Sequence, residues 1–170
     1  GIASLRKGIH YLLQAFNELE KEIEIEWWHL GDISDEIKKV INNNKSKNIH
    51  LKGNINKYEL YNYYSQGSVF ILPSIEDGFG MVILEAMACR LPVICSENTG
   101  IRNILTKHGQ EGFIVPIRDH ISIKEKIEFL YKNENIRQSM GNKAFELVHN
   151  KFTWNHYGDR YIKFLHNVSN

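Results

Sequence analysis

Apolar and polar positions alternate along this chain between the spacing typical of strands and the spacing typical of helices. Short apolar runs predict strands at residues 23–30, 48–52, 68–72, 92–95 and 112–115. Apolar positions at helical spacing predict helices at residues 7–16, 35–41, 57–66, 81–89, 101–108, 121–131, 134–149 and 154–167. The pattern therefore predicts alternating helices and strands, with extra helices at the carboxyl end.

The run at residues 68–72 is apolar throughout and is ended by Pro73. Such a run is typical of a strand that is covered on both faces, as in a parallel sheet. Strands connected through helices indicate right-handed crossovers. The sequence thus predicts an α/β fold with a doubly wound, mainly parallel, Rossmann-like sheet in one domain over residues 1–170. In such a sheet ligands bind beyond the carboxyl ends of the strands.

Composition excludes several classes of protein. A net charge of +1 provides no basic field that would attract nucleic acid. No apolar run approaches the ~20 residues that span a bilayer. Cys89 and Cys95 are too few for a disulfide framework, and the eight histidines are scattered, so we expect a reducing, cytoplasmic setting and no metal site. Because the chain begins at Gly1, we expect a fragment of a longer protein.

The loop between the strand at 68–72 and the helix at 81–89 carries the candidate chemistry. Gly78 and Gly80 permit a sharp bend and a close approach of the backbone to a ligand. Free N–H groups at the start of the helix at Met81 would suit a pyrophosphate. Two carboxylates, Asp77 and Glu85, flank this position, and carboxylates suit hydroxyl groups better than phosphate. A ligand with diols on both sides of a diphosphate is a nucleotide sugar.

Residues 74–88 resemble the donor-site signature of the family 4 retaining glycosyltransferases, which have the GT-B fold. The resemblance implies that Asp77 contacts hydroxyls of the donor sugar, that Glu85 holds the ribose, and that the N–H groups of Gly80 and Met81 bind the phosphates. Asp77 stands where the family usually has Glu, and the neighbouring Glu76 is the alternative; the spacing to Glu85 favours Asp77. The rest of this loop completes the expected donor-binding set with Gly78, Phe79 and Val82.

Further motifs follow in the family's order. Residues 4–8 resemble its basic loop, so Lys7 is expected to neutralise the donor phosphates, and Arg6 to replace an Arg that the family places at Ile2. Thr99 and Gly100 belong to a segment that resembles the strand and loop closing the site. Residues 112–116 and 152–154 resemble the family's last strand and closing helix. Gly53 is expected beside the base pocket. The resemblance assigns the catalytic roles to Lys7, Asp77 and Glu85.

The resemblance implies retaining transfer of a hexosyl group from a nucleotide-diphosphate donor to a saccharide or lipid-linked acceptor, in polysaccharide or glycoconjugate biosynthesis. No cofactor or metal is expected, because Lys7, Arg6 and the helix start can offset the charge of the leaving group. The acceptor-binding domain is absent from this chain, so we expect donor binding without efficient transfer. Any peripheral association with the inner face of the membrane would use the absent parts.

Several alternatives stay open beside this interpretation. The chain could be a non-catalytic nucleotide- or anion-binding regulatory module on the same fold. A phosphorelay receiver would need an acidic cluster together with a phosphoacceptor Asp. Asp32 has no such cluster, so this class is disfavoured. Glu85 could pair with a neighbour such as Arg90, and Lys7 and Arg6 could be solvated charges. Four tyrosines are expected to cover the sheet rather than to stack on a nucleotide base: Tyr58, Tyr61, Tyr63 and Tyr64.

The last helix carries an apolar stripe. Its members are Trp154, Tyr157, Tyr161, Phe164, Leu165 and Val168. The resemblance implies that this helix crosses back to the other domain. We therefore expect part of the stripe to be exposed in this chain.

Overall fold

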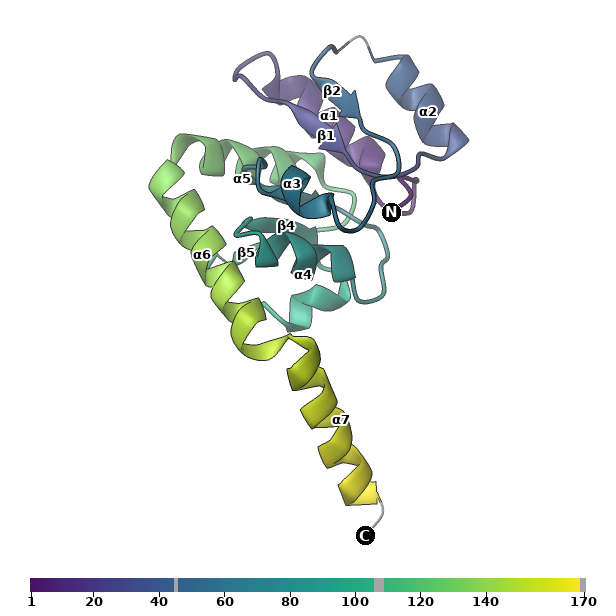
Figure 1. Cartoon of the computed structure of the whole chain (residues 1–170). Helices are drawn as coiled ribbons and strands as arrows, with labels where there is room; N and C mark the ends of the chain where they lie inside the picture. Colours follow the sequence, from purple (N-terminus) through teal and green to yellow (C-terminus); the bar gives the residue numbers. More distant parts are fainter. Residues whose placement is uncertain (45, 106–108, 169–170) are drawn as a thin grey trace.

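The computed structural model describes residues 1–44, 46–105 and 109–168 (Figure 1). Its strands are β1 (Trp27–His29), β2 (Ile49–Leu51), β3 (Phe70–Leu72), β4 (Val93–Ser96) and β5 (Gly112–Val115). Its helices are α1 (Ile9–Leu19), α2 (Asp35–Asn42), α3 (Leu60–Tyr64), α4 (Met81–Ala88), the 3-10 helix η1 (Gly100–Asn103), α5 (His120–Lys132), α6 (Glu134–Lys151) and α7 (Trp154–Val168). The predicted order of elements is confirmed.

All strand pairings are parallel, and helices connect the strands, which confirms the predicted α/β, Rossmann-like class. The strands fall into two sheets rather than one: β1 pairs with β2, and β3, β4 and β5 pair in that order. Among the described residues no ladder joins β1 to β3. The single predicted sheet is therefore interrupted between these two strands.

Strand β4 lies at the centre of the three-stranded sheet and is buried along its whole length. Val93 and Cys95 pack into a cluster with residues of α4 and α6 on one face. Ile94 points to the other face and packs with residues of α1 and α5. This alternation explains the continuous apolar run, because successive side chains of a strand enter opposite layers.

Helix α1 packs on both sheets. Leu12, Ala15 and Leu19 join the cluster around Ile94, and Ile9 and Leu13 join a third cluster with residues of α2 and β1. Gly8 precedes α1 with φ +66°, and a Cβ there would lie 2.0 Å from the carbonyl oxygen of Pro73. Only glycine fits this close approach, which holds the start of α1 against the end of β3.

Two predicted helices differ from the structure. The helix expected at 57–66 is only α3, and Tyr58 and Tyr61 are 81% and 64% exposed, so the prediction that they cover the sheet is wrong. Tyr64 is buried and does cover it. The helix expected at 101–108 is the short 3-10 helix η1, and residues 106–108 of that prediction lie outside the described residues. A hydrogen bond from Gly100 N–H to the Gly78 carbonyl (2.7 Å) ties the start of η1 to the neighbouring loop.

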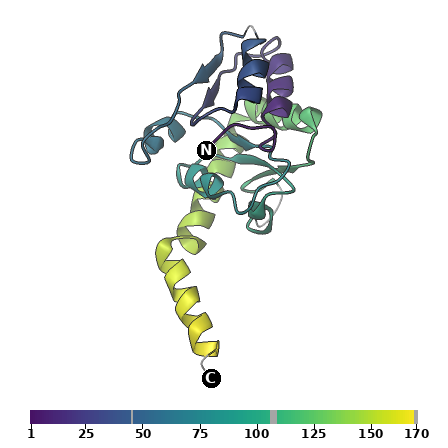
Figure 2. The ribbon, with the colours of Figure 1, turned by 90° about the vertical axis from the view of Figure 1, so that its right-hand side faces the viewer.

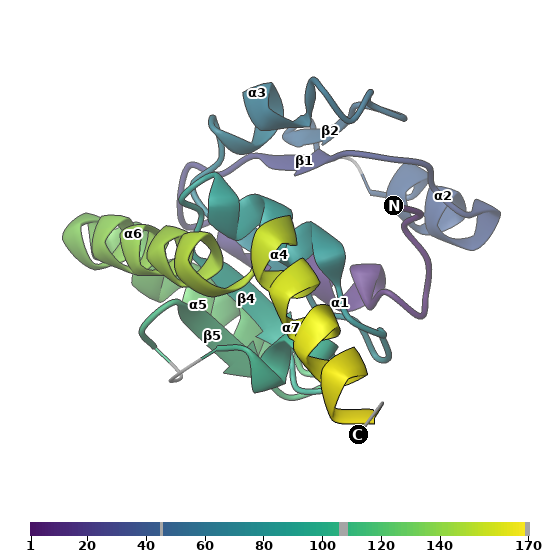
Figure 3. The same ribbon diagram turned by 60° about the horizontal axis from the view of Figure 1, so that its bottom comes forward.

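Helix α7 extends away from the rest of the chain (Figures 1 and 2) and buries none of its residues. The six residues of the apolar stripe are between 45% and 79% exposed. The view in Figure 3 shows α7 continuing from the end of α6. The expected exposure of the stripe is confirmed. Among the described residues, no helix combines the length and the apolar character needed to cross a bilayer.

Candidate donor-binding site

The loop after β3 and the loop after β4 are tied together at the carboxyl ends of their strands. The Asp77 N–H donates to the Asn98 carbonyl (3.1 Å), and Asp77 forms a parallel bridge with Thr99. A Cβ on Gly100 would lie 2.5 Å from the Gly78 carbonyl oxygen, so the two loops touch through their backbones. The structure therefore brings together Asp77, Gly78, Thr99 and Gly100 of the predicted set.

Lys7 and Asp77 form an ion pair between the ammonium group and Oδ2 of the carboxylate. The two side chains are only 22% and 13% exposed, so water screens the pair weakly. The Ser74 hydroxyl lies 3.4 Å from the same carboxylate oxygen. Two residues predicted to contact different parts of a donor are thus already bonded to each other.

Arg6 lies on the same loop as Lys7 but contacts the backbone. Its guanidinium donates to the Glu76 carbonyl (3.2 Å), while its own carbonyl accepts from the Ile75 N–H (2.9 Å). The Glu76 side chain is exposed, whereas Asp77 is half-buried and paired with Lys7. Of the two candidate acids, Asp77 is the one that the fold holds against the basic loop.

Buried polar residues that the sequence analysis missed support this arrangement. Ser74 and Ser96 are fully buried, and the Ser96 hydroxyl donates to the Ser74 carbonyl. The Asn98 amide donates to the Ile75 carbonyl (3.1 Å), and the Thr99 hydroxyl donates to the Ser96 carbonyl (2.8 Å). Thr99 is only 3% exposed, and its hydroxyl forms its hydrogen bond within the loop. A serine within two residues of the end of each predicted strand, at 68–72 and 92–95, was the sequence signal for these contacts.

The start of α4 is open beside this loop. Gly80 precedes the helix in the left-handed region (φ 73°), and no side chain caps the helix there. A Cβ on Gly78 would meet nothing within 4 Å. Phe79 and Met81 are 44% and 51% exposed, and Val82 follows in the first turn. An uncapped helix start with open space in front is suited to an anion.

Glu85 lies one turn further along α4 and is exposed. Burial first, and then the charge and hydrogen bonding of Glu85, raise the pKa of the Tyr64 hydroxyl above its ordinary value. Glu85 therefore stands beside Tyr64 of α3. Arg90 donates to Asn142 (2.9 Å) and lies 4.0 Å from the centre of the Phe145 ring. The alternative in which Glu85 pairs with Arg90 does not hold in this structure.

Gly53 lies apart from these residues. It follows β2 with φ +68°, and its carbonyl accepts a hydrogen bond from the Gly31 N–H (2.7 Å) at the end of the two-stranded sheet. No contact described for Gly53 joins it to Asp77. Its predicted place beside a base pocket stays a prediction.

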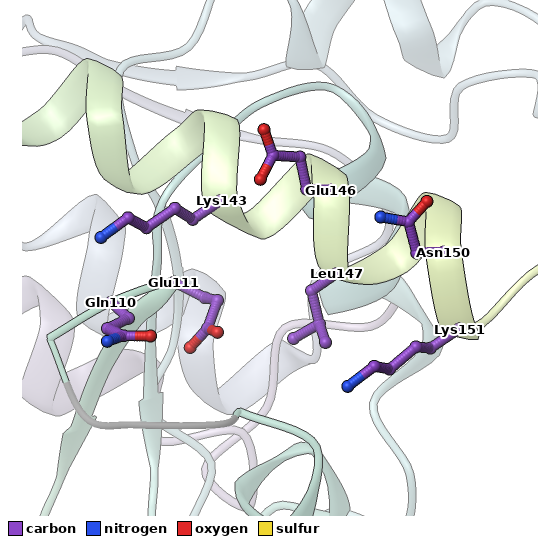
Figure 4. Close-up of a pocket in the computed structure, with 7 residues that line it drawn as sticks. All are labelled: Gln110, Glu111, Lys143, Glu146, Leu147, Asn150 and Lys151. Atoms are coloured by element: carbon purple, nitrogen blue, oxygen red, sulfur yellow. The ribbon is translucent and has the colours of Figure 1, made fainter.

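A cavity lies between the residues that lead into β5 and the helix α6 (Figure 4). It is lined by Gln110, Glu111, Lys143, Glu146, Leu147, Asn150 and Lys151. Since β5 begins at Gly112, this cavity is at the amino end of the strand, away from the predicted site. None of the predicted site residues lines it. Within the described ranges, no group of three or more His, Cys, Asp or Glu residues could hold a metal ion.

Comparison with known proteins assigns the chain to a family. The family described as glycosyl transferases group 1 matches residues 1–147. This chain belongs to that family. It is 31% identical to the capsular polysaccharide biosynthesis glycosyltransferase CapM of Staphylococcus aureus, over 94% of this chain and 43% of CapM. The chain thus spans less than half the length of that relative.

Solved structures agree with this assignment. The C-terminal domain of the group 1 glycosyl transferase LpcC from Francisella tularensis superposes with a TM-score of 0.79 at 22% identity, covering 91% of this chain and 84% of that domain. The pneumococcal O-GlcNAc transferase GtfA, solved with UDP and GlcNAc, has a TM-score of 0.80 at 26% identity, covering 98% of this chain and 35% of GtfA. The fold is that of the Rossmann-like half of a GT-B glycosyltransferase.

Proposed function

We propose that this chain is the donor-binding part of a retaining glycosyltransferase that takes a hexosyl group from a nucleotide-diphosphate sugar. One observation carries the proposal: the uncapped start of α4 lies between two carboxylates, Asp77 and Glu85, with Lys7 at the same edge. Helix N–H groups suit the diphosphate, and carboxylates suit the hydroxyls on either side of it. The binding of UDP by the related GtfA supports a nucleotide diphosphate as the ligand class.

Lys7 has a specific part in this proposal. When the bond between sugar and diphosphate breaks, negative charge develops on the leaving diphosphate, and a nearby cation stabilises it. In the structure that cation is paired with Asp77. Donor binding would exchange this ion pair for two contacts, from Lys7 to phosphate and from sugar hydroxyls to Asp77. Arg6 would assist from the same loop, and we propose that no metal ion is needed.

The remaining parts of the reaction belong to the longer protein. An acceptor-binding domain would face the site across a cleft and would pack on the exposed stripe of α7. Residues 1–170 alone would then bind the donor without transferring the sugar efficiently, because half of the closed site is missing. We place the reaction at the cytoplasmic side of the cell, with a saccharide or lipid-linked acceptor in polysaccharide or glycoconjugate synthesis.

Calorimetric titration of the full-length protein with UDP, GDP and ADP, and then with their sugar conjugates, tests this proposal. We expect one nucleotide to bind, Glu85→Ala to remove most of that binding, and Asp77→Ala to weaken only the sugar conjugate. Transfer measured with and without EDTA tests the proposed independence of metal. Binding that is indifferent to both carboxylates would instead support the regulatory-module alternative.

A further inference from the structure

The side chain of Asp77 is held through one of its two carboxylate oxygens. Lys7 pairs with Oδ2, and the Ser74 hydroxyl donates to the same oxygen over 3.4 Å. Among the contacts between described residues, both hydrogen bonds of this carboxylate end on Oδ2 and none ends on Oδ1. A carboxylate oxygen has lone pairs for up to two hydrogen bonds. The fold therefore fixes one oxygen of Asp77 and leaves the other able to accept from a hydroxyl.

The two partners of Oδ2 differ in how firmly they are placed. Lys7 reaches the carboxylate with a long side chain that is 22% exposed. Ser74 is fully buried, and its hydroxyl turns about a single side-chain bond. A fully buried hydroxyl must be hydrogen-bonded to offset its desolvation, and Asp77 is the acceptor that the described residues provide. Ser74 is thus the rigid partner of Asp77, and Lys7 is the adaptable one.

The backbone around Ser74 is fixed from two sides. The carbonyl of Ser74 accepts from the hydroxyl of Ser96 at the end of the neighbouring strand. The following N–H group, of Ile75, donates to the Arg6 carbonyl (2.9 Å) on the basic loop. The Ser74 hydroxyl therefore keeps a defined position in the site, whichever group the ammonium of Lys7 contacts.

Under the proposed function, on which this inference rests, Lys7 turns to the diphosphate when the donor binds. Asp77 then keeps its N–H bond to the Asn98 carbonyl (3.1 Å), which fixes the main chain and not the carboxylate. The carboxylate itself keeps the bond to Ser74. At 3.4 Å that bond is longer than the ~2.7 Å usual between a hydroxyl and a carboxylate, so it can shorten once Lys7 no longer shares Oδ2.

We propose that Ser74 is a positioning residue for sugar transfer: its buried hydroxyl holds Oδ2 of Asp77 so that Oδ1 meets a hydroxyl of the donor sugar. The two carboxylate oxygens then have separate tasks, one toward the fold and one toward the ligand. A carboxylate held by one oxygen directs the other along a fixed line, and a sugar hydroxyl must lie near that line to bond well. Ser74 in this way favours hexoses with a hydroxyl on the side that faces Asp77, although it touches no sugar itself.

Ser96 provides the matched comparison. It is also a fully buried serine at the end of a strand, but its hydroxyl donates to a backbone carbonyl and not to Asp77. Loss of either hydroxyl leaves an acceptor with one donor fewer, so both alanine variants should lower the stability of the fold. Only the Ser74 variant should act on the sugar through Asp77.

Calorimetric titration of the full-length protein tests the proposal, with UDP, GDP and ADP and then their hexose conjugates as probes. For the nucleotide that binds, we expect Ser74→Ala to weaken binding of the sugar conjugate about 10-fold, through the loss of one hydrogen bond to a charged group. Affinity for the nucleotide diphosphate alone should change by less than about twofold, because its contacts are independent of Asp77. Ser96→Ala should leave the ratio of the two affinities unchanged. Equal losses for the two ligands in Ser74→Ala would overturn the proposal.

A double-mutant cycle separates positioning from a general effect on the loop. In the Asp77→Ala background the hydroxyl of Ser74 has no carboxylate to hold, so Ser74→Ala should weaken the sugar conjugate no further. Ser96→Ala acts on the backbone, so its effect should be the same in both backgrounds. An undiminished effect of Ser74→Ala in the Asp77→Ala background would show that Ser74 has only a structural role.

The same titrations distinguish the role of Ser74 from the proposed function. If no nucleotide binds, or if Asp77→Ala leaves the sugar conjugate unaffected, the proposed function fails and the role of Ser74 fails with it. If Asp77→Ala weakens the sugar conjugate and Ser74→Ala does not, the function stands and the role of Ser74 alone is overturned. Ser74→Cys, which has a similar size and a weak donor, is the second variant if Ser74→Ala does not fold. Full affinity of Ser74→Cys for the sugar conjugate would contradict the proposal.

Discussion

The two carboxylates that flank the start of α4 stand in opposite environments. Asp77 is half-buried, bonded to Lys7, and held on a loop that Ser96 and Asn98 connect to the neighbouring strand. Glu85 is exposed on the surface of α4, with Tyr64 beside it. The Asp77 end of the site is therefore built into the fold, whereas the Glu85 end is presented by a helix that would form without it.

Because the two carboxylates differ in burial, substitutions at the two ends of the site should differ in how they change the stability of the fold and the affinity for ligand. A change at the Asp77 end disturbs contacts that hold two loops together, so it should alter folding as well as binding. A change at Glu85 removes an exposed carboxylate, so it should alter binding alone. Variants of the full-length protein test this contrast.

The largest effect is expected for Lys7→Ala. It removes the cation proposed to stabilise the leaving diphosphate and leaves the half-buried Asp77 carboxylate without its partner. We expect the kcat of sugar transfer to fall about 100- to 1000-fold. Lys7→Arg keeps the charge and is the control, with much of the activity retained. A loss below about threefold in Lys7→Ala would remove Lys7 from the mechanism.

Glu85→Ala should separate binding from stability most clearly. We expect nucleotide affinity to fall about 10- to 100-fold, because hydrogen bonds to a charged carboxylate are lost. The free energy of unfolding should change by less than about 0.5 kcal/mol, since the side chain is exposed. Titration calorimetry and urea unfolding measure the two quantities. Glu76→Ala, at an exposed acid next to Asp77, should leave nucleotide affinity and stability unchanged; an equal loss of nucleotide affinity there would show that the effect of Glu85→Ala is not specific to Glu85.

Gly100→Ala tests how tightly the Asp77 end is built. The added Cβ would lie 2.5 Å from the Gly78 carbonyl oxygen, so the two loops must move apart. We expect a loss of about 1–3 kcal/mol in the free energy of unfolding. Gly78→Ala is the matched control for stability, because its Cβ would meet nothing within 4 Å. Equal unfolding midpoints for the two variants would mean that the loops are not in contact.

The smallest effect is expected at Asp119, which lies outside both ends of the site. Its carboxylate caps α5 by accepting from the Ser122 N–H (3.0 Å), and hydrogen bonds from Ser122 lower the pKa of Asp119. Asp119→Ala should lower stability by about 1 kcal/mol, and Asp119→Asn by less. Because the folded pKa is the lower one, this contribution is complete above the ordinary carboxyl pKa and is lost as pH falls through the folded value. Urea unfolding between pH 7 and pH 3 should show the difference shrinking, while donor affinity at pH 7 stays unchanged.

The sequence by itself determined the class of fold and the position of the candidate site. Apolar runs such as residues 92–95 could be recognised because strand β4 is covered on both faces, so Val93, Ile94 and Cys95 all point into packed layers. Gly80 and the first turn of α4 could be placed because the constraint on a strand-to-helix turn is local in sequence. The same holds for Asp77 and Glu85, whose spacing depends only on that turn and the helix after it.

Only the tertiary structure decided which partners these residues have. The ion pair between Lys7 and Asp77 joins loops 70 residues apart in sequence, and no local pattern contains that contact. The buried hydroxyl of Ser96 and the exposure of Tyr58 depend likewise on which element packs above them. The interruption between β1 and β3 also comes from the arrangement of strands in space, because hydrophobic periodicity shows that a strand forms and not which strand lies beside it.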